Sequence, residues 1–404
     1  MSISTKKITY LLTLSSAFEY YDFIIYGLMA NYISILFFSV DNPFISQIGA
    51  YSIFTLGYLV RPLGGVILGI IGDFGSRRKV FIIGNLILAI TAIIISLMPT
   101  YNQIGIIAPI ILIILRIVQA SVFSTELPGA ISLIQDQKTQ HPGKSFSFVV
   151  SGTAIGTILA SFILFLIEKF LTKQEILEFG WRIPYIFGAV LYFIGIILRK
   201  NLPYNEIKKD KTSLLLNIFS EYKKVAVFIS VMLVPAYLII LNILFPSILP
   251  KLYNYLVKDV YLAISLSLIW SVFFTPLFAH LTANFNKINI LRLTFFLVLP
   301  ISILLNLLLN QSSFILLVIS LCIYQSIISI SMVIGFPLMV KFFSDKLRLT
   351  LTSVCYNISF LIASFLPLFI SRIIWNNSSI GIWAILVILA LFAIPRLNSL
   401  ENEI

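Results

Sequence analysis

Long apolar runs, interrupted by short polar turns, make up most of this chain of 404 residues. Runs of about 17 to 30 apolar residues are long enough to cross a lipid bilayer as helices. Counting these runs predicts an all-α membrane protein with twelve transmembrane helices. The predicted spans cover residues 10–38, 46–72, 79–98, 105–134, 145–170, 183–199, 225–249, 257–281, 289–309, 312–341, 350–374 and 377–395.

The longest polar stretch divides these spans into two sets of six. We therefore expect an N-terminal six-helix half over residues 1–199 and a C-terminal six-helix half over residues 225–404. Residues 200–224 form the linker loop between them. Two such halves predict alternating access, with a site between them near the middle of the membrane.

The composition supports the membrane class. The chain is 59% hydrophobic and only 11% charged, with a mean hydropathy of +1.03, whereas soluble domains carry about 25% charged residues. The net charge of +12 comes from basic residues that stand between apolar runs, so it predicts no nucleic-acid partner. Cys322 and Cys355 have no paired spacing, and neither a disulfide, a metal site nor a cofactor is predicted.

The distribution of basic residues predicts the orientation. Of the 28 lysines and arginines, 20 fall at loops and ends on the side of the N-terminus and six on the opposite side. Because cytoplasmic loops carry the excess of Lys and Arg, we expect both termini and the linker to face the cytoplasm. The two remaining arginines, Arg61 and Arg116, lie inside predicted spans. The first apolar run lacks a small-residue cleavage site, so we expect an uncleaved first span.

Two carboxylates interrupt the first span. At about 1.5 Å per residue, Glu19 lies about 13 Å along the helix from Tyr10, near the bilayer centre, and Asp22 is one turn further on. Two carboxylates this close in a low-dielectric site should not both ionise readily, so one of them should take up and release a proton near physiological pH. A carboxylate that changes its charge in this way is what a proton-coupling site requires. We expect Asp22 to carry the proton and Glu19 to tune it. The alternative is a structural pair neutralised by Arg61 or Arg116.

Span four carries three further polar groups on one face, Arg116, Gln119 and Glu126, within about 80° of one another. The Arg116 guanidinium has the geometry to bind a substrate carboxylate through two hydrogen bonds. Its alternative role is an ion pair with Glu19 or Asp22. Glu126 lies deeper toward the cytoplasm, as an inner proton acceptor or as a structural partner of the loop region.

Aromatic and polar side chains complete the predicted substrate site. Tyr20, Tyr21 and Tyr26 stand beside the acids and could enclose an ammonium group by cation–π contacts, although aromatic residues in a helix more often pack. The C-terminal half has no charge in the middle of a span, and it offers polar groups such as Tyr356 and Asn357. We expect the N-terminal half to bind the proton and the substrate's charge, and the C-terminal half to supply hydrogen bonds.

A glycine-rich turn joins spans two and three, and its weaker copy follows span eight. Residues 69–79 contain Gly69, Gly72, Asp73, Arg77 and Arg78, and residues 279–287 stand at the equivalent place in the second half. We expect the first copy to act as a conformational latch that holds the two halves together in one state. The second copy has lost its acid, which predicts one strong latch.

These motifs resemble the major facilitator superfamily, whose signature Gly-x-Leu-Gly-Asp-Arg-x-Gly-Arg-Lys is similar to residues 69–79. Within it, the chain resembles the metabolite:proton symporters that include proline/betaine and 2-oxoglutarate transporters. The segments that carry this likeness are Glu19-Tyr20-Tyr21-Asp22-Phe23, Arg61-Pro62-Leu63-Gly64-Gly65, Gly180-Trp181-Arg182-Ile183-Pro184-Tyr185 and Leu347-Arg348-Leu349-Thr350. The resemblance implies the major facilitator fold and transport by proton symport.

The sequence therefore predicts a multi-pass transporter of the bacterial inner membrane, working as a monomer, that imports a small zwitterion such as proline or betaine with a proton. A dicarboxylate:proton symporter of the 2-oxoglutarate kind is the alternative, because two buried arginines would suit two carboxylates. A receptor or sensor on the same scaffold is disfavoured by short tails without a signalling domain. An enzyme is not expected, because no nucleophile–base set is present.

Overall fold

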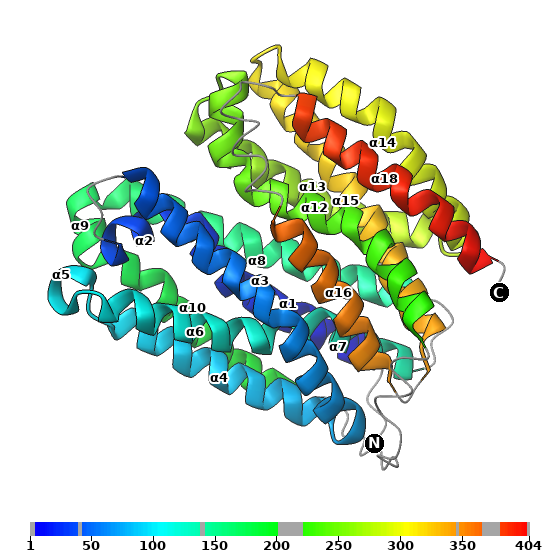
Figure 1. Ribbon diagram of the computed structural model, residues 1–404, viewed down its shortest axis with the longest axis horizontal. Coiled ribbons are helices and arrows are strands. Elements are labelled where there is room, and N and C mark those ends of the chain that lie inside the picture. The colour runs from blue at the N-terminus through cyan, green and yellow to red at the C-terminus, as the bar shows by residue number, and fades with distance from the viewer. Residues whose placement is uncertain are drawn as a thin grey trace.

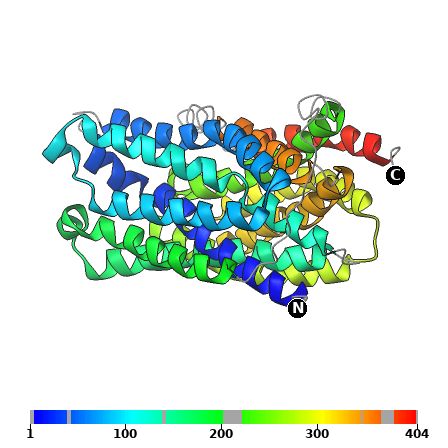
Figure 2. The ribbon, with the colours of Figure 1, turned by 90° about the horizontal axis from the view of Figure 1, so that it is seen from below.

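The computed structural model describes residues 5–38, 43–137, 142–200, 221–344, 347–365 and 380–401, and every regular element in these ranges is a helix. Figure 1 shows two helical bundles side by side, the first built from α1 to α10 and the second from α12 to α18. Seen from a second direction, the long helices of both bundles run along a common axis (Figure 2).

The helices of the first bundle are α1 (Thr5–Leu28), α2 (Ala30–Phe37), α3 (Pro43–Phe74), α4 (Arg77–Leu97), α5 (Tyr101–Ile104), α6 (Ile107–Phe123), α7 (Glu126–Asp136), α8 (Pro142–Phe170), α9 (Lys173–Glu178), the 3₁₀ helix η1 (Gly180–Arg182) and α10 (Ile183–Arg199). The helices of the second bundle are α12 (Tyr222–Tyr253), α13 (Val257–Leu281), α14 (Lys287–Leu309), α15 (Phe314–Phe342), α16 (Arg348–Ser364) and α18 (Ile380–Glu401).

Ten helical segments in the described ranges are long and apolar enough to cross a membrane. The other two of the twelve predicted positions are occupied by α1, which carries two lysines and two acids, and by α16, which has 17 described residues. Large apolar side chains such as Leu63, Phe273 and Leu307 are more than half exposed on the outside of the bundles, where lipid would cover them. The all-α membrane fold predicted from the sequence is confirmed.

Two predicted spans are broken helices. The first ends as α1 at Leu28 and resumes as α2 after Met29, with the amide of Ile33 still donating to the carbonyl of Met29 at 2.9 Å. The fourth breaks between α6 and α7, where the hydroxyl of Ser124 donates to the carbonyl of Ser121 at 2.6 Å. Such back-bonding by a hydroxyl bends a helix.

Several predicted boundaries shift or lie outside the described residues. The last helix, α18, runs from Ile380 to Glu401, beyond the predicted end at residue 395. The end of the predicted span 350–374, the start of 377–395 and most of the linker 200–224 are not in the described ranges. Helix α12 begins inside the predicted linker, at Tyr222.

Close backbone contacts hold α8 against α1. A Cβ added to Gly152 would overlap the carbonyl oxygen of Thr13, and one added to Gly156 would overlap that of Ala17. Small residues one helical turn apart let two membrane helices approach until their backbones touch. On its other side α8 packs against α13 of the second bundle, so this helix contributes to the seam between the bundles.

We expect Gly156→Ala to destabilise the protein by about 1–3 kcal/mol, because the added methyl group has no space and the helices must move apart. Thermal unfolding of the detergent-solubilised chain measures the loss. Gly57→Ala is the matched control, since its added Cβ would lie 3.6 Å from Cβ of Ala120, an ordinary contact. An equal unfolding midpoint for the two variants would contradict the tight α1–α8 contact.

Candidate functional site

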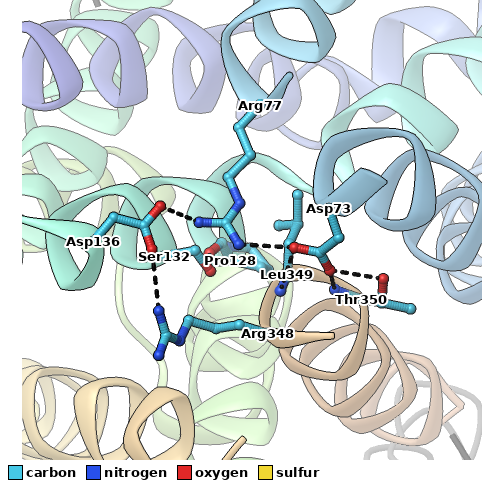
Figure 3. A network of polar contacts seen from close by, with 8 residues as sticks. All are labelled: Asp73, Arg77, Pro128, Ser132, Asp136, Arg348, Leu349 and Thr350. Carbon is cyan, nitrogen blue, oxygen red and sulfur yellow. Dashed lines mark hydrogen bonds and ion pairs between the residues drawn. The ribbon is translucent and has the colours of Figure 1, made fainter. Parts of the chain in front are cut away.

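A network of charged side chains joins the two bundles where α3 ends and α16 begins (Figure 3). We call it the Asp73 network, and it consists of Asp73, Arg77, Asp136, Arg348, Leu349 and Thr350. The end of the bundle that contains it is called the Asp73 end. Asp73 is fully buried. Its Oδ2 accepts hydrogen bonds from the backbone amide and the hydroxyl of Thr350, both at 2.9 Å, and its Oδ1 accepts from the amide of Leu349 at 3.3 Å.

These bonds make Asp73 a cap for a helix of the other half. The first amides of a helix have no partner within the helix and carry the positive end of its dipole. A buried carboxylate at that point accepts hydrogen bonds from these amides and places a negative charge at the positive end of the dipole. Because the acceptor is ionised, the capping bonds are charge-assisted. Helices α3 and α16 can approach this closely because α3 has glycines at the contact. A Cβ at Gly69 would be 2.8 Å from Cα of Thr350, and one at Gly72 would be 2.6 Å from Cδ2 of Leu349.

Arg77 and Asp136 extend the network across the seam (Figure 3). Arg77 forms an ion pair with Asp73 at 2.8 Å and a second one with Asp136 of α7. Asp136 also pairs with Arg348 of α16 at 3.0 Å. Asp73 and Arg77 were predicted as latch residues. Sequence analysis missed Asp136, and it named Arg348 in a segment of the family resemblance without giving it a place in the latch. Arg78 follows Arg77 in α4 and is half-buried.

A second buried cluster contains two acids and one arginine. Arg199, the last residue of α10, forms an ion pair with Glu19 of α1, and its Nη2 lies 2.7 Å from Oε2 of Glu126 of α7. Its Nη1 also donates to Oδ1 of Asn85 and to the carbonyl of Phe81, both at 3.0 Å. We call Glu19, Glu126 and Arg199 the two-acid cluster. All three side chains are at most 4% exposed.

Sequence analysis missed Arg199, because a basic residue directly after an apolar run was counted with the loops. A signal was present in the pattern of α10. Gly188, Tyr192, Gly195 and Arg199 recur at spacings of 4, 3 and 4, so they share one helix face. That face packs on α1 and α4, since a Cβ at Gly188 would lie 3.4 Å from Oδ1 of Asp22 and one at Gly195 would lie 2.6 Å from Nδ2 of Asn85.

Asp22 belongs to a third set, separate from Glu19. Its Oδ2 accepts a hydrogen bond from Nε2 of Gln119 at 3.3 Å, and Oε1 of Gln119 accepts one from Nη1 of Arg116 at 2.9 Å. The Arg116 guanidinium lies 4.0 Å from the ring centre of Tyr26. The structure therefore brings Asp22, Gln119, Arg116 and Tyr26 together. It directs Glu19 to Arg199, and the break between α6 and α7 places Glu126 with Arg199 as well, apart from Arg116 and Gln119 with which a shared helix face was predicted.

Arg61 lies near this set within an aromatic cage. Its guanidinium is 4.3 Å from the ring centre of Phe23, 4.4 Å from that of Tyr58 and 4.5 Å from that of Phe123. Arg61 is 1% exposed, and its Nε and Nη2 have no hydrogen-bond partner in the described structure. Together with Asp22, Arg116, Gln119 and Tyr192, it lines a cavity of about 20 Å³ inside the first bundle, which is space for about one water molecule.

A larger cavity lies between the bundles, and we call it the seam cavity. It has a volume of about 90 Å³ and is lined by α1 and α8 of the first bundle and by α12, α13 and α15 of the second. Its polar lining consists of Tyr20, Thr153, Thr157, Ser161, Asn242, Tyr261, Ser271, Gln325 and Ser329. Among the described lining residues there is no Asp, Glu, Lys or Arg.

The predicted substrate residues are distributed unevenly around this cavity. Tyr20 lines it, and its hydroxyl lies 3.1 Å from that of Tyr356 across the seam. Tyr21 instead donates to the carbonyl of Pro184 at 2.9 Å within the first bundle. Arg61, Arg116 and Gln119 line the smaller cavity described above.

Asn357 makes a different contact across the seam. Pro128 has no amide hydrogen to donate to the carbonyl of Ser124, four residues earlier. That carbonyl accepts from Nδ2 of Asn357 instead, at 2.8 Å.

A family model and solved structures agree with this architecture. Residues 12–350 match the model of the Major Facilitator Superfamily. The chain belongs to the major facilitator superfamily, a family of membrane transporters and not of enzymes. The proton:xylose symporter XylE, in complex with 6-bromo-6-deoxy-D-glucose, has the same fold with a TM-score of 0.79, at 13% identity over 96% of this chain and 94% of that one.

Curated relatives match about half of this chain. A protein of Staphylococcus aureus (strain COL) that carries the name of a proline/betaine transporter is 35% identical over 202 residues, which are 49% of this chain and 43% of the relative. The proline/betaine transporter of Salmonella typhimurium (strain LT2) is 33% identical over 191 residues, 47% of this chain and 38% of the relative. The chain thus spans less than half the length of the curated relatives that it matches.

We expect Arg199→Gln to destabilise the protein by about 3–5 kcal/mol, because it leaves Glu19 and Glu126 buried without a cation. Adding Glu19→Gln and Glu126→Gln to this variant should restore most of the stability. Thermal unfolding in detergent measures both changes. Lys200→Gln, at the exposed neighbouring position, is the control and should leave the midpoint unchanged. Equal midpoints for Arg199→Gln and Lys200→Gln would show that the ion pairs contribute nothing.

Proposed function

We propose that this protein is a proton-coupled symporter that imports a small zwitterion, of the kind that proline and betaine represent, by alternating access. The observation that carries the proposal is the seam cavity, which is lined from both bundles by hydroxyl, amide and apolar groups. A site between two six-helix halves is accessible from one side at a time when the halves rock against each other. The relatives named for proline and betaine transport support the substrate class.

The charge of the cavity favours a zwitterion over a dicarboxylate. A dianion would enter a cavity whose described lining offers no cation, at a large desolvation cost. A zwitterion has no net charge, and Tyr20 in the lining could contact its ammonium group by a cation–π interaction. The dicarboxylate reading keeps one supporting observation, the Arg61 guanidinium, which has no carboxylate partner in the described structure.

The two-acid cluster is the arrangement best suited to hold the coupled proton. Two carboxylates there share a single guanidinium, so one negative charge is in excess in a buried place. A proton on Glu19 or Glu126 removes that excess. Asp22 has the opposite surroundings, with two arginines lining the same small cavity. The assignment of the proton to Asp22 made from the sequence stays a prediction, and the geometry favours the pair Glu19 and Glu126.

The contacts at the Asp73 end support a state that is closed on that side. We propose that this end faces the cytoplasm of a bacterium, because 20 of the 28 basic residues lie on the side of the N-terminus. In this state the Asp73 network holds α3 and α7 of one half against α16 of the other at the cytoplasmic end. Breaking that network would open the cytoplasmic side, which completes the transport cycle.

Uptake by proteoliposomes tests the function. We expect labelled proline or betaine to accumulate when an inward proton gradient is imposed, and 2-oxoglutarate to be excluded. Accumulation of 2-oxoglutarate alone would establish the dicarboxylate alternative. Uptake of none of the three, or uptake that ignores the gradient, would contradict symport of either kind.

Separate variants locate the proton. Glu126→Gln should reduce gradient-driven accumulation more than 10-fold, because the two-acid cluster then has no excess negative charge with which to bind a proton. Exchange of internal for external substrate, which needs no net proton transfer, should continue. The exchange assay also shows that the variant is folded. Glu178→Gln, at an exposed carboxylate, is the control. If Glu19→Gln and Glu126→Gln both keep full accumulation and Asp22→Asn abolishes it, the proton belongs to Asp22.

A further inference from the structure

The turn between α13 and α14 repeats the geometry of the turn that carries Asp73. Ser76 caps the start of α4 by accepting a hydrogen bond from the amide of Lys79, and Asn286 caps the start of α14 by accepting from the amides of Ile288 and Asn289. With these two caps aligned, the position of Asp73 corresponds to Ala283 and that of Arg77 to Lys287. The second turn therefore keeps the cation and lacks the carboxylate.

The missing acid changes what the cation contacts. Arg77 pairs with Asp73 and Asp136, two carboxylates. Lys287 instead donates to the carbonyl oxygens of Thr282 and Ala283, at the end of its own preceding helix. Backbone carbonyls carry only a partial negative charge, so the positive charge of Lys287 is not neutralised there.

A cavity of about 570 Å³ occupies the space next to this turn. Three lysines line it, Lys144 at the start of α8, Lys287 at the start of α14 and Lys341 at the end of α15. None of its described lining residues is Asp or Glu. Lys144 belongs to the first bundle and the other two to the second, and the ammonium groups of Lys144 and Lys287 repel each other. The cavity is thus lined by positive charges from both halves.

The cavity also stands in the same relation to the helices as the Asp73 network does. In that network the start of α16 meets the end of α3, and α7 supplies Asp136 at its last residue. Here α8 packs against α13, the helix that precedes the second turn, and near the start of α8 a Cβ at Gly143 would lie 3.5 Å from the carbonyl oxygen of Val333 in α15. Near its end α15 supplies Lys341, a cation in place of an acid. Neither Asp73 nor Asp136 of the Asp73 network therefore has an acidic counterpart among the described residues of the cavity.

We propose that this cavity binds a phosphate-bearing anion, which takes the place of the missing carboxylates and bridges the two halves at the Asp73 end. Three ammonium groups match the charge of a phosphate monoester or of the phosphodiester in an anionic lipid headgroup, and a lysine binds phosphate as a point charge. Apolar side chains such as Pro337 and Leu338 in the lining leave space for the rest of the ligand. The bound anion stabilises the arrangement in which Lys144 faces Lys287 and Lys341.

The test uses the full chain in phosphatidylcholine nanodiscs, with thermal unfolding as the readout. Inorganic phosphate is added in one arm, and part of the lipid is replaced by phosphatidylglycerol in the other. We expect the unfolding midpoint to rise by roughly 2–4 °C in at least one arm, and the rise to shrink in high salt. A rise with phosphate indicates a free anion, and a rise with phosphatidylglycerol alone indicates a lipid headgroup. No rise in either arm would overturn the proposal.

Substitutions place the effect in this cavity. Lys144→Gln, Lys287→Gln and Lys341→Gln should each weaken the apparent affinity about five-fold, as expected for one lysine near an anionic group. Lys223→Gln, at an exposed lysine of α12 that does not line the cavity, is the control. An equal loss in the control, or no loss in the three variants, would show that the anion binds elsewhere.

A reverse substitution tests the equivalence of the two turns. Ala283→Asp restores the carboxylate that the second turn lacks, beside Lys287. We expect this variant to raise the midpoint without any added anion and to lose most of the response to phosphate or phosphatidylglycerol. A full response in Ala283→Asp would mean that the anion does not occupy the place of the missing acid.

Discussion

The carboxylate of Asp73 is the group on which the relation between the two bundles depends. It is fully buried, it pairs with Arg77 of its own half, and it accepts three hydrogen bonds from Leu349 and Thr350 of the other. A buried charge is stable only when its bonds are satisfied. The start of α16 and the end of α3 must therefore stay together for as long as the Asp73 carboxylate is kept from water. Separating them exposes the carboxylate and the helix terminus to water, where both can be solvated.

The other buried charges of the first bundle divide into two clusters of opposite sign. Glu19 and Glu126 exceed Arg199 by one negative charge, while Arg61 and Arg116 exceed Asp22 by one positive charge. Helix α1 carries an acid of each cluster, Glu19 and Asp22, one turn apart. A proton that enters the two-acid cluster changes the balance between the two, and α1 also lines the seam cavity through Tyr20. This helix is thus the physical link by which we propose that protonation and substrate binding are coupled.

Much of the fold could be predicted from the sequence, because the length of each apolar run and the basic residues at its ends are constrained by the bilayer itself. The Asp73 segment was also predictable, since a glycine spacing that permits close contact precedes an acid and two arginines. The partner of each buried charged side chain could not be predicted from the sequence. Glu19 and Asp22 are one turn apart in α1, yet Glu19 pairs with Arg199 and Asp22 bonds to Gln119 of α6, and only tertiary packing decides this. Arg199 was missed because a basic residue directly after an apolar run was counted with the loops, whereas its guanidinium donates to the carbonyl of Phe81 in α4.

Distance measurements between spin labels across both ends of the bundle test most directly whether Asp73 holds the halves together. On a background with Cys322→Ser and Cys355→Ser, one pair of labels is placed at Lys79 and Tyr222 near the Asp73 end and another at Gln103 and Gln311 at the far end, four exposed positions. We predict that Asp73→Asn adds a population with a longer distance at the Asp73 end and a shorter one at the far end, because a neutral amide forms weaker capping bonds. Distance distributions that are identical with Asp73 and with Asn at this position would contradict the account.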